Sequence, residues 1–376
     1  MTDSEPVPTP DHVEQPGIAD LGLLLKGLSS GERTRFERIF QVHTITGQLV
    51  APQAMHDWIA EHFGSVEAVG EQRIVKVTNL VSQEGSLFNE LRARRPLQAP
   101  AGRDDLEETI EDAEGGPFCH PKTGTPADVF GRVRGEHSIS ASNIAKYDGW
   151  HGVIIFDDHH PLSFTEEQLA DHINTAQAWA ERAHEADPDA CYPFFLWNCL
   201  WRSGASILHG HAQMTLTRGG HYVKVEALRQ AALRYRRQNG SDYFTDLIAA
   251  HRALGLAIDH NSATILPSLT PFKEKETHII GAEVNRDLVA AIYFVLNTFI
   301  ERFGMQSFNL ALYQRPLAAT PEPWEGFPTI VRLIDRGNLQ DKTSDLGAME
   351  LFAQSVVASD PFQVAAALAA AKEARI

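Results

Sequence analysis

The chain has 376 residues, 43% hydrophobic and 22% charged, so it contains enough apolar material for a sizeable core. Its formal net charge of −16 disfavours nucleic acids and anionic membranes as partners, because phosphate groups repel an acidic surface. The three cysteines suggest no disulfide framework, and no stretch is apolar enough to span a membrane. We therefore expect a cytoplasmic protein.

The N-terminal region divides into a tail and an extension. Residues 1–18 are acidic and rich in proline, which is typical of a disordered tail. Residues 19–76 carry helical patterns at 31–40 and 55–63, so an N-terminal helical extension is predicted there. The segment QRIVKVTNLV, from residue 72, begins a region of shorter strands and loops.

Residues 77–220 are predicted to form a first unit of strands around one long helix. HGVIIF (151–156) alternates as a strand does, and residues 164–186 follow with helical periodicity. Ser163 or Thr165 can cap this helix, because each is followed three residues later by Glu or Gln. Two further strands are predicted, at 192–198 and 213–217.

Residues 221–376 repeat the same order of elements. The predicted elements are a strand at 276–281, a helix at 285–303, and strands at 307–313 and 329–335. Because strand, helix, strand, loop and strand occur twice, the sequence predicts an α+β fold of two duplicated units, each an antiparallel sheet with packed helices. Asp360 is expected to cap a last helix, with Pro361 at its first position.

The turn before strand 213–217 contains an unusual group of polar residues. His209 and His211 flank Gly210, and residues two apart on an extended segment point to the same face. Gly210 allows another backbone or a ligand to approach closely. A neutral imidazole can attack phosphorus, and the amide of Gln213 can hold a phosphoryl oxygen. Metal ligands and hydrogen-bonded core histidines are the other interpretations of an isolated His-x-His.

The intervals around this group resemble a known family. Asn198 precedes Ser206 by eight residues, and Ser206 precedes His209 by three. The run ending in HGHAQ resembles the active-site signature of galactose-1-phosphate uridylyltransferases, in the histidine-triad superfamily, which have Asn, Ser and His-Pro-His-x-Gln at these intervals. The resemblance covers roughly residues 79–376 and implies two histidine-triad-like units. The second has FPTIV (327–331) where the first has HGH, which implies that it is degenerate.

The resemblance implies a two-step nucleotidyl transfer. His211 would attack the α-phosphorus of a nucleoside diphosphate sugar and release a sugar 1-phosphate. A second sugar 1-phosphate, or another phosphate acceptor, would then take the nucleotidyl group from the histidine. Gln213 would steady the phosphoryl oxygens, and Ser206 would hydrogen-bond the phosphate. A nucleotide phosphorylase or adenylyltransferase of the same superfamily, and a non-catalytic nucleotide-binding protein on the same scaffold, are the alternatives.

The resemblance also implies a substrate-binding set and a quaternary structure. LVSQEGSLFNELRARRP (80–96) is similar to a stretch whose arginines contact the nucleotide phosphates, and SNIAKY (142–147) is similar to one whose asparagine lies beside the nucleoside. The family forms dimers, so a homodimer is expected by analogy. The implied substrate-binding residues are Arg92, Arg95, Asn143, Asn198 and Glu350.

A zinc site is the one cofactor that the resemblance implies, with no organic cofactor. PFCHPKTGTP (117–126) resembles a Cys-x-x-Cys zinc knuckle, and the implied ligands are Cys119, His160 and His209. Gly116 stands where the family has the first cysteine. Structural zinc takes four ligands, so a fourth would have to come from the neighbouring His120 or from elsewhere in the chain.

Overall fold

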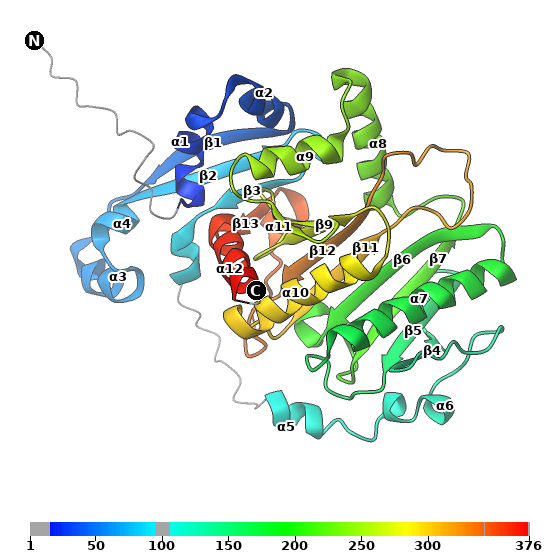
Figure 1. The fold of residues 1–376 in the computed structure, drawn as a ribbon. Coiled ribbons are helices and arrows are strands. Elements are labelled where there is room, and N and C mark those ends of the chain that lie inside the picture. The colour runs from blue at the N-terminus through cyan, green and yellow to red at the C-terminus, as the bar shows by residue number, and fades with distance from the viewer. Residues whose placement is uncertain (1–15, 95–105, 342, 375–376) are drawn as a thin grey trace, which may run out of the picture.

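The computed structural model describes residues 16–94, 106–341 and 343–374, and their strands form two sheets (Figure 1). The larger sheet has nine strands in the order β4-β5-β7-β6-β11-β12-β10-β9-β8, and all neighbours are antiparallel. The strands are β4 (Ser138–Ser142), β5 (Trp150–Phe156), β6 (Ala190–Cys199), β7 (His211–Arg218), β8 (Ile258–His260), β9 (Ala263–Pro267), β10 (Thr277–Gly281), β11 (Phe308–Tyr313) and β12 (Thr329–Asp335). The predicted α+β class and antiparallel pairing are confirmed.

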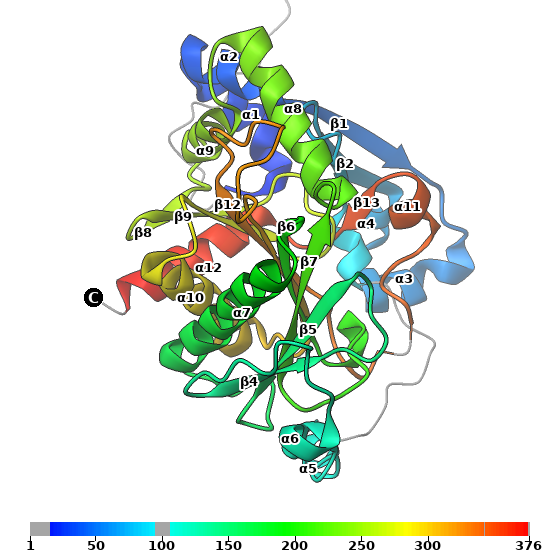
Figure 2. The same cartoon turned by 90° about the vertical axis from the view of Figure 1, so that its right-hand side faces the viewer.

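Two long helices, α7 (Glu166–Ala186) and α10 (Arg286–Phe303), lie side by side on one face of the large sheet (Figure 2). Thr165, rather than Ser163, caps α7, because its side chain accepts a hydrogen bond from the N–H of Gln168. The Gln168 side chain in turn accepts from the N–H of Thr165, which completes a capping box. The core beneath these helices includes Leu169, Ile173, Ala176, Leu288, Ile292, Phe299, Ile154, Met214, Leu312 and Val331.

The strands of the two predicted units meet at the middle of the large sheet. β6 pairs with β11, with Asn198 opposite Asn309. On one side of this pair follow β7, β5 and β4, and on the other follow β12, β10 and β9. Corresponding strands of the two regions therefore occupy corresponding places on either side of the β6·β11 pair.

The small sheet corrects the prediction for residues 19–76. It has the order β1-β2-β3-β13, and β1 (Phe40–Gln48) is a nine-residue strand inside the segment predicted to be helical. β1 lies at the edge of the sheet with most of its side chains exposed, so its sequence does not alternate as a half-buried strand should. Four helices do surround it, namely α1 (Leu21–Gly27), α2 (Ser30–Ile39), α3 (His56–Phe63) and α4 (Val66–Gly70).

The predicted boundary between residues 76 and 77 falls inside β2 (Glu71–Asn79), which pairs with both β1 and β3 (Gly85–Phe88). The fourth strand, β13 (Ser355–Val357), comes from the far end of the chain and pairs with β3 in parallel. The extension is therefore joined to the C-terminal region by main-chain hydrogen bonds.

The C-terminal helix α12 (Pro361–Glu373) begins as predicted, with Asp360 at the cap and Pro361 at the first position. One carboxylate oxygen of Asp360 accepts a hydrogen bond from the N–H of Phe362 at 2.8 Å. Its other oxygen accepts from the N–H of Ile18 at 2.7 Å. A single side chain thus caps the last helix and binds the start of the described chain.

The face of the large sheet opposite α7 and α10 is divided between a packed region and the candidate site. Over β10 and β12 it is covered by the small sheet together with α8 (Val223–Asn239) and α9 (Tyr243–Arg252). There Ile280 and Ile330 pack against Val77 and Phe244. Over β5 and β7 the same face carries His151, His211 and Gln213, because their strand neighbours Ile154, Ala212 and Met214 belong to the core beneath the helices. Within the described residues, no helix has the length and apolar character needed to cross a membrane.

Candidate functional site

The segment from His209 to Gln213 is held in place by an unusually close approach of two stretches of backbone. The N–H of Gly210 donates to the carbonyl of His159, and the carbonyl of Gly210 accepts from the N–H of Phe156, both at 3.0 Å. A Cβ atom on Gly210 would lie 2.7 Å from Cδ2 of Phe156 and 3.2 Å from the carbonyl oxygen of Asp158. The predicted close approach at Gly210 is therefore made by another backbone segment.

His211 is buried, and one of its ring nitrogens is fixed by the main chain. Its Nδ1 lies 2.9 Å from the carbonyl oxygen of His209, an acceptor, so Nδ1 carries the proton and Nε2 carries the lone pair. Burial lowers the pKa of His211, which keeps the ring neutral near pH 7. The ring of Phe118 packs edge-on against His211 at 5.1 Å and against His209 at 6.2 Å. Both histidines therefore contact the same aromatic side chain.

Gln213 belongs to a group of three polar side chains on the same face. Its Oε1 lies 2.8 Å from Nε2 of His151, on the neighbouring strand β5. Nδ2 of Asn143 lies 3.2 Å from the same ring nitrogen. No sequence motif includes His151, and only the register of β5 against β7 reveals that it faces the same side as Gln213.

The turn between β6 and β7 is built from residues with positive φ. Leu200 has φ 65° and Gly204 has φ 97°, at the two ends of the 3-10 helix Trp201–Ser203. A buried leucine rarely adopts this conformation, which is common only for glycine. The turn presents Ser206 at the surface, next to the HGH segment. Its geometry thus leaves the Ser206 hydroxyl accessible to a ligand.

Asn198, at the end of β6, has its side-chain oxygen occupied by the protein. Nδ2 of Asn309 donates to it at 2.7 Å and also to the carbonyl of Ser203 at 2.9 Å. The guanidinium of Arg336 then donates to the side-chain oxygen of Asn309 at 2.6 Å. This chain of hydrogen bonds orients the Asn198 amide so that its NH2 group is the part left to contact a ligand.

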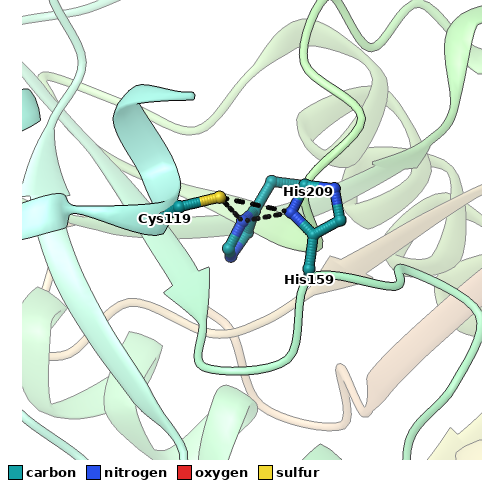
Figure 3. A group of neighbouring side chains, drawn as sticks. All are labelled: Cys119, His159 and His209. Atoms are coloured by element: carbon teal, nitrogen blue, oxygen red, sulfur yellow. Dashed lines mark hydrogen bonds between the residues drawn. The ribbon is translucent and has the colours of Figure 1, made fainter. Parts of the chain in front are cut away.

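Cys119, His159 and His209 form a compact group beside the nucleophile candidate (Figure 3). Sγ of Cys119 lies 3.4 Å from Nδ1 of each histidine, and the two Nδ1 atoms are 3.0 Å apart. Cys119 comes from the 3-10 helix Pro117–Cys119, which follows α5 (Leu106–Glu111), His159 from the loop after β5, and His209 from the segment before β7. Three separate parts of the chain thus meet at three donor atoms.

The hydrogen bonds of the two imidazoles show that this group suits a metal ion. Nε2 of His159 donates to the carbonyl of Ile110 and Nε2 of His209 to that of Phe156, each at 2.8 Å. Both Nδ1 atoms therefore carry lone pairs, and these point at each other and at the Cys119 sulfur. Facing lone pairs repel unless a cation lies between them, and metal-bound histidines commonly donate their second N–H to a carbonyl. Two imidazoles and a thiol are ligands that Zn²⁺ prefers.

This geometry corrects one predicted ligand. His159, and not His160, occupies the second histidine position, and Nε2 of His160 instead lies 3.3 Å from a carboxylate oxygen of Glu107. His120, considered as a fourth ligand, is exposed and lies outside the group. Among the described residues no fourth Cys, His, Asp or Glu joins the three. Among the described residues the group therefore offers three protein ligands to a metal ion.

Arg92 and Glu350, predicted to bind substrate, line a separate polar cavity with Lys273 and Arg202. Glu350 accepts a hydrogen bond from the N–H of Gly347 and has an oxygen 3.8 Å from Nζ of Lys273. Arg202 lies in the 3-10 helix of the turn that carries Ser206, so this turn connects the cavity with the HGH segment. Arg95 lies outside the described residues.

The chain is similar to several solved structures. No family model and no curated protein sequence matches the chain. An ADP-glucose phosphorylase from Arabidopsis thaliana with bound ADP-glucose is similar, with a TM-score of 0.59 and 15% identity over 77% of this chain and 95% of that one. A uridylyltransferase has a TM-score of 0.55 and 17% identity, over 81% of this chain and 99% of that one. A GalT-like protein from Arabidopsis thaliana has a TM-score of 0.54 and 15% identity, over 68% of this chain and 91% of that one. The chain therefore has the fold of these proteins, as the resemblance in its sequence predicted.

Proposed function

We propose that the chain is a divergent member of the galactose-1-phosphate uridylyltransferase family and transfers a nucleotidyl group through a covalent intermediate on His211. The observation that supports this most directly is the state of the His211 ring. It is buried and neutral, with Nδ1–H held by the His209 carbonyl and Nε2 bearing the lone pair. An imidazole oriented in this way is a nucleophile that needs no prior deprotonation.

In the first step Nε2 of His211 attacks the α-phosphorus of a nucleoside diphosphate sugar. The N–P bond forms, the bond from phosphorus to the bridging oxygen breaks, and the sugar 1-phosphate leaves with the electron pair. The His209 carbonyl continues to accept the Nδ1–H, and this hydrogen bond stabilises the positive charge that develops on the ring. In the second step a phosphate oxygen of the acceptor attacks phosphorus and the N–P bond breaks.

The group of Cys119, His159 and His209 lies beside His211, because His209 is hydrogen-bonded to His211. A Zn²⁺ ion held by Cys119, His159 and His209 would supply structural cross-linking of three segments rather than act on the substrate. His209 contributes its ring to the group and its carbonyl to His211. His209 alone of the three thus also fixes the orientation of the nucleophile.

We propose a nucleoside diphosphate sugar as the donor and a hexose 1-phosphate as the acceptor, as in a uridylyltransferase. The support for this choice is the resemblance of the segment from Asn198 to Gln213 to the uridylyltransferase signature. The Arg92 cavity gives no further support, because it is lined by six carboxylates as well as five cations. A phosphorylase, in which inorganic phosphate is the acceptor, is the second candidate, and the similarity to an ADP-glucose phosphorylase favours considering it. We further infer that the two halves of the large sheet arose by duplication and that the chain forms a homodimer.

The test is to incubate the protein with UDP-glucose, UDP-galactose or ADP-glucose and measure the mass of the intact chain. We expect an acid-labile increase equal to one nucleoside monophosphate residue in the wild type and none in His211→Ala. The labelled protein is then mixed with galactose 1-phosphate or with inorganic phosphate, and the acceptor that removes the label distinguishes a uridylyltransferase from a phosphorylase. Nucleotide binding without any adduct would contradict the proposal and favour a binding protein.

A further inference from the structure

His151 is a buried histidine that contacts Gln213 from the neighbouring strand, and its ring is hydrogen-bonded on both sides. The main-chain N–H of Tyr147 points at Nδ1 of His151 at 3.0 Å. A peptide N–H can only donate, so Nδ1 must be the acceptor and the ring proton must sit on Nε2. Burial lowers the pKa of His151, in agreement with a neutral ring. The main chain therefore selects one tautomer of this side chain.

This tautomer determines how the two neighbouring amides are oriented. Nε2–H of His151 donates to Oε1 of Gln213 at 2.8 Å, which directs the Gln213 NH2 group away from the ring. Asn143 is fixed independently, because its Oδ1 accepts a hydrogen bond from the N–H of Ala145 at 3.1 Å. Its NH2 group lies 3.2 Å from Nε2 of His151, which already carries a proton and cannot accept. Each amide is left with an NH2 group as its free donor.

From this geometry we infer that His151 is a positioning residue that holds the Gln213 carboxamide with its nitrogen, and not its oxygen, available to a phosphoryl oxygen. The inference rests on the proposed function, because the orientation of Gln213 affects the reaction only if a phosphoryl group binds there. A carboxamide that can rotate by half a turn presents either a donor or an acceptor, and an acceptor repels a phosphoryl oxygen. By occupying Oε1, His151 makes Gln213 a donor only. Within the described residues the Gln213 side chain makes one hydrogen bond, through Oε1, and its nitrogen is left to donate to a ligand.

The surroundings of His151 hold its ring firmly. The ring of Tyr147 stacks on it at 4.4 Å with an interplanar angle of 28°. The carbonyl of His151 accepts from the N–H of Asn143 at 2.9 Å and from Nζ of Lys146 at 3.3 Å. The loop between β4 and β5 thus packs against both the ring and the main chain of this residue. Because the ring is held in this way, its hydrogen bond to Oε1 keeps the Gln213 carboxamide in one orientation.

The first test measures the tautomer and does not depend on activity. Long-range ¹H–¹⁵N spectra of uniformly ¹⁵N-labelled protein, compared with His151→Phe, identify the His151 signals. We expect a proton on Nε2 and none on Nδ1, and a Gln213 side-chain amide signal that shifts in His151→Phe. The same substitution at His251, which is buried and hydrogen-bonded to the carbonyl of Leu247 outside the site, should leave the Gln213 signal in place. A proton on Nδ1, or a Gln213 signal indifferent to His151→Phe, overturns the inference.

The second test measures the rate of the first chemical step. His151→Phe should slow formation of the nucleotidyl-histidine by about tenfold to a hundredfold, with little change in nucleotide affinity, because one charge-assisted hydrogen bond loses its orientation. His151→Gln, which can place an NH2 group near Oε1 of Gln213, should recover much of the rate, and His251→Phe should retain it. Unchanged rates in His151→Phe would overturn the role of His151 while leaving the proposed function intact. If the wild type forms no adduct, the proposed function fails, and the spectra alone decide how Gln213 is oriented.

Discussion

The carbonyl oxygen of His209 lies 2.9 Å from Nδ1 of His211, while the ring of His209 lies 3.4 Å from the sulfur of Cys119. His209 therefore orients His211 through its main chain and contacts Cys119 through its side chain. We therefore expect substitutions that displace the main chain of His209 to affect both the Cys119 group and His211.

The first prediction concerns the metal. Purified protein should contain about one Zn²⁺ per chain, and His159→Ala should lose it, because three ligands become two. His160→Ala is the matched control, since the adjacent histidine faces Glu107 instead of the group. Elemental analysis of the three proteins checks this. Loss of metal in His160→Ala with retention in His159→Ala would contradict the ligand assignment.

The second prediction concerns Gly210. Gly210→Ala should lower the free energy of unfolding by about 1–3 kcal/mol, because its Cβ would lie 2.7 Å from Cδ2 of Phe156. Gly31→Ala, in helix α2 with no atom within 4 Å of the new Cβ, should be neutral or slightly stabilising. Denaturant unfolding measures both. Equal stability of the two variants would show that the Phe156 side chain yields without cost.

The third prediction is a loss of stability in mild acid. Burial lowers the pKa of His172, His221 and His251 from 6.5 to about 4. Between these values the unfolded chain binds protons that the folded chain does not, so the stability is fully present above pH 6.5 and falls as the pH drops towards 4. Each histidine contributes roughly 3 kcal/mol over this interval. Unfolding measured across the interval should show a smaller slope in His251→Phe than in the wild type, and an unchanged slope would argue against a buried neutral His251.

The fourth prediction concerns Arg332, which joins the large sheet to the β2–β3 hairpin. Its guanidinium donates to Glu276 and to Glu84, both at 2.7 Å, and the Glu276 side chain is 1% exposed. Arg332→Leu should cost about 3–5 kcal/mol, because it removes the guanidinium from the buried carboxylate of Glu276 and leaves it only Nε2 of His278 and the N–H of Phe272. The control is Arg134→Ala, which breaks the exposed ion pair with Asp157 and should cost at most about 1 kcal/mol. Similar costs for both variants would contradict the distinction between buried and exposed pairs.

Elements that carry their own local signals could be predicted from the sequence. The caps Thr165 and Asp360 lie next to the helices that they begin, and the strands β5, β10 and β12 have bounds within one residue of those expected. β1 was missed because an edge strand has little buried surface to impose alternation on its sequence. The strand β13 has only three residues, and its pairing with β3 depends on contacts far along the chain.

The candidate site shows the same division between local and distant causes. His209, His211 and Gln213 belong to one short segment, and the resemblance of that segment to a known family selects them. The choice between His159 and His160 depends on which ring reaches the carbonyl of Ile110, which no spacing encodes. The contact of His151 with Gln213 requires knowledge of which strands are neighbours.

The hydrogen bond of Ile18 to Asp360 and the pairing of β3 with β13 affect how the chain folds during synthesis. A ribosome releases residues in order, and N-terminal units commonly fold while the rest is still being synthesised. Here the first sheet lacks one strand, and the first helices lack an anchor, until residue 360 has emerged. The nascent chain must therefore keep the hydrophobic residues of its first sheet protected until residue 360 has emerged.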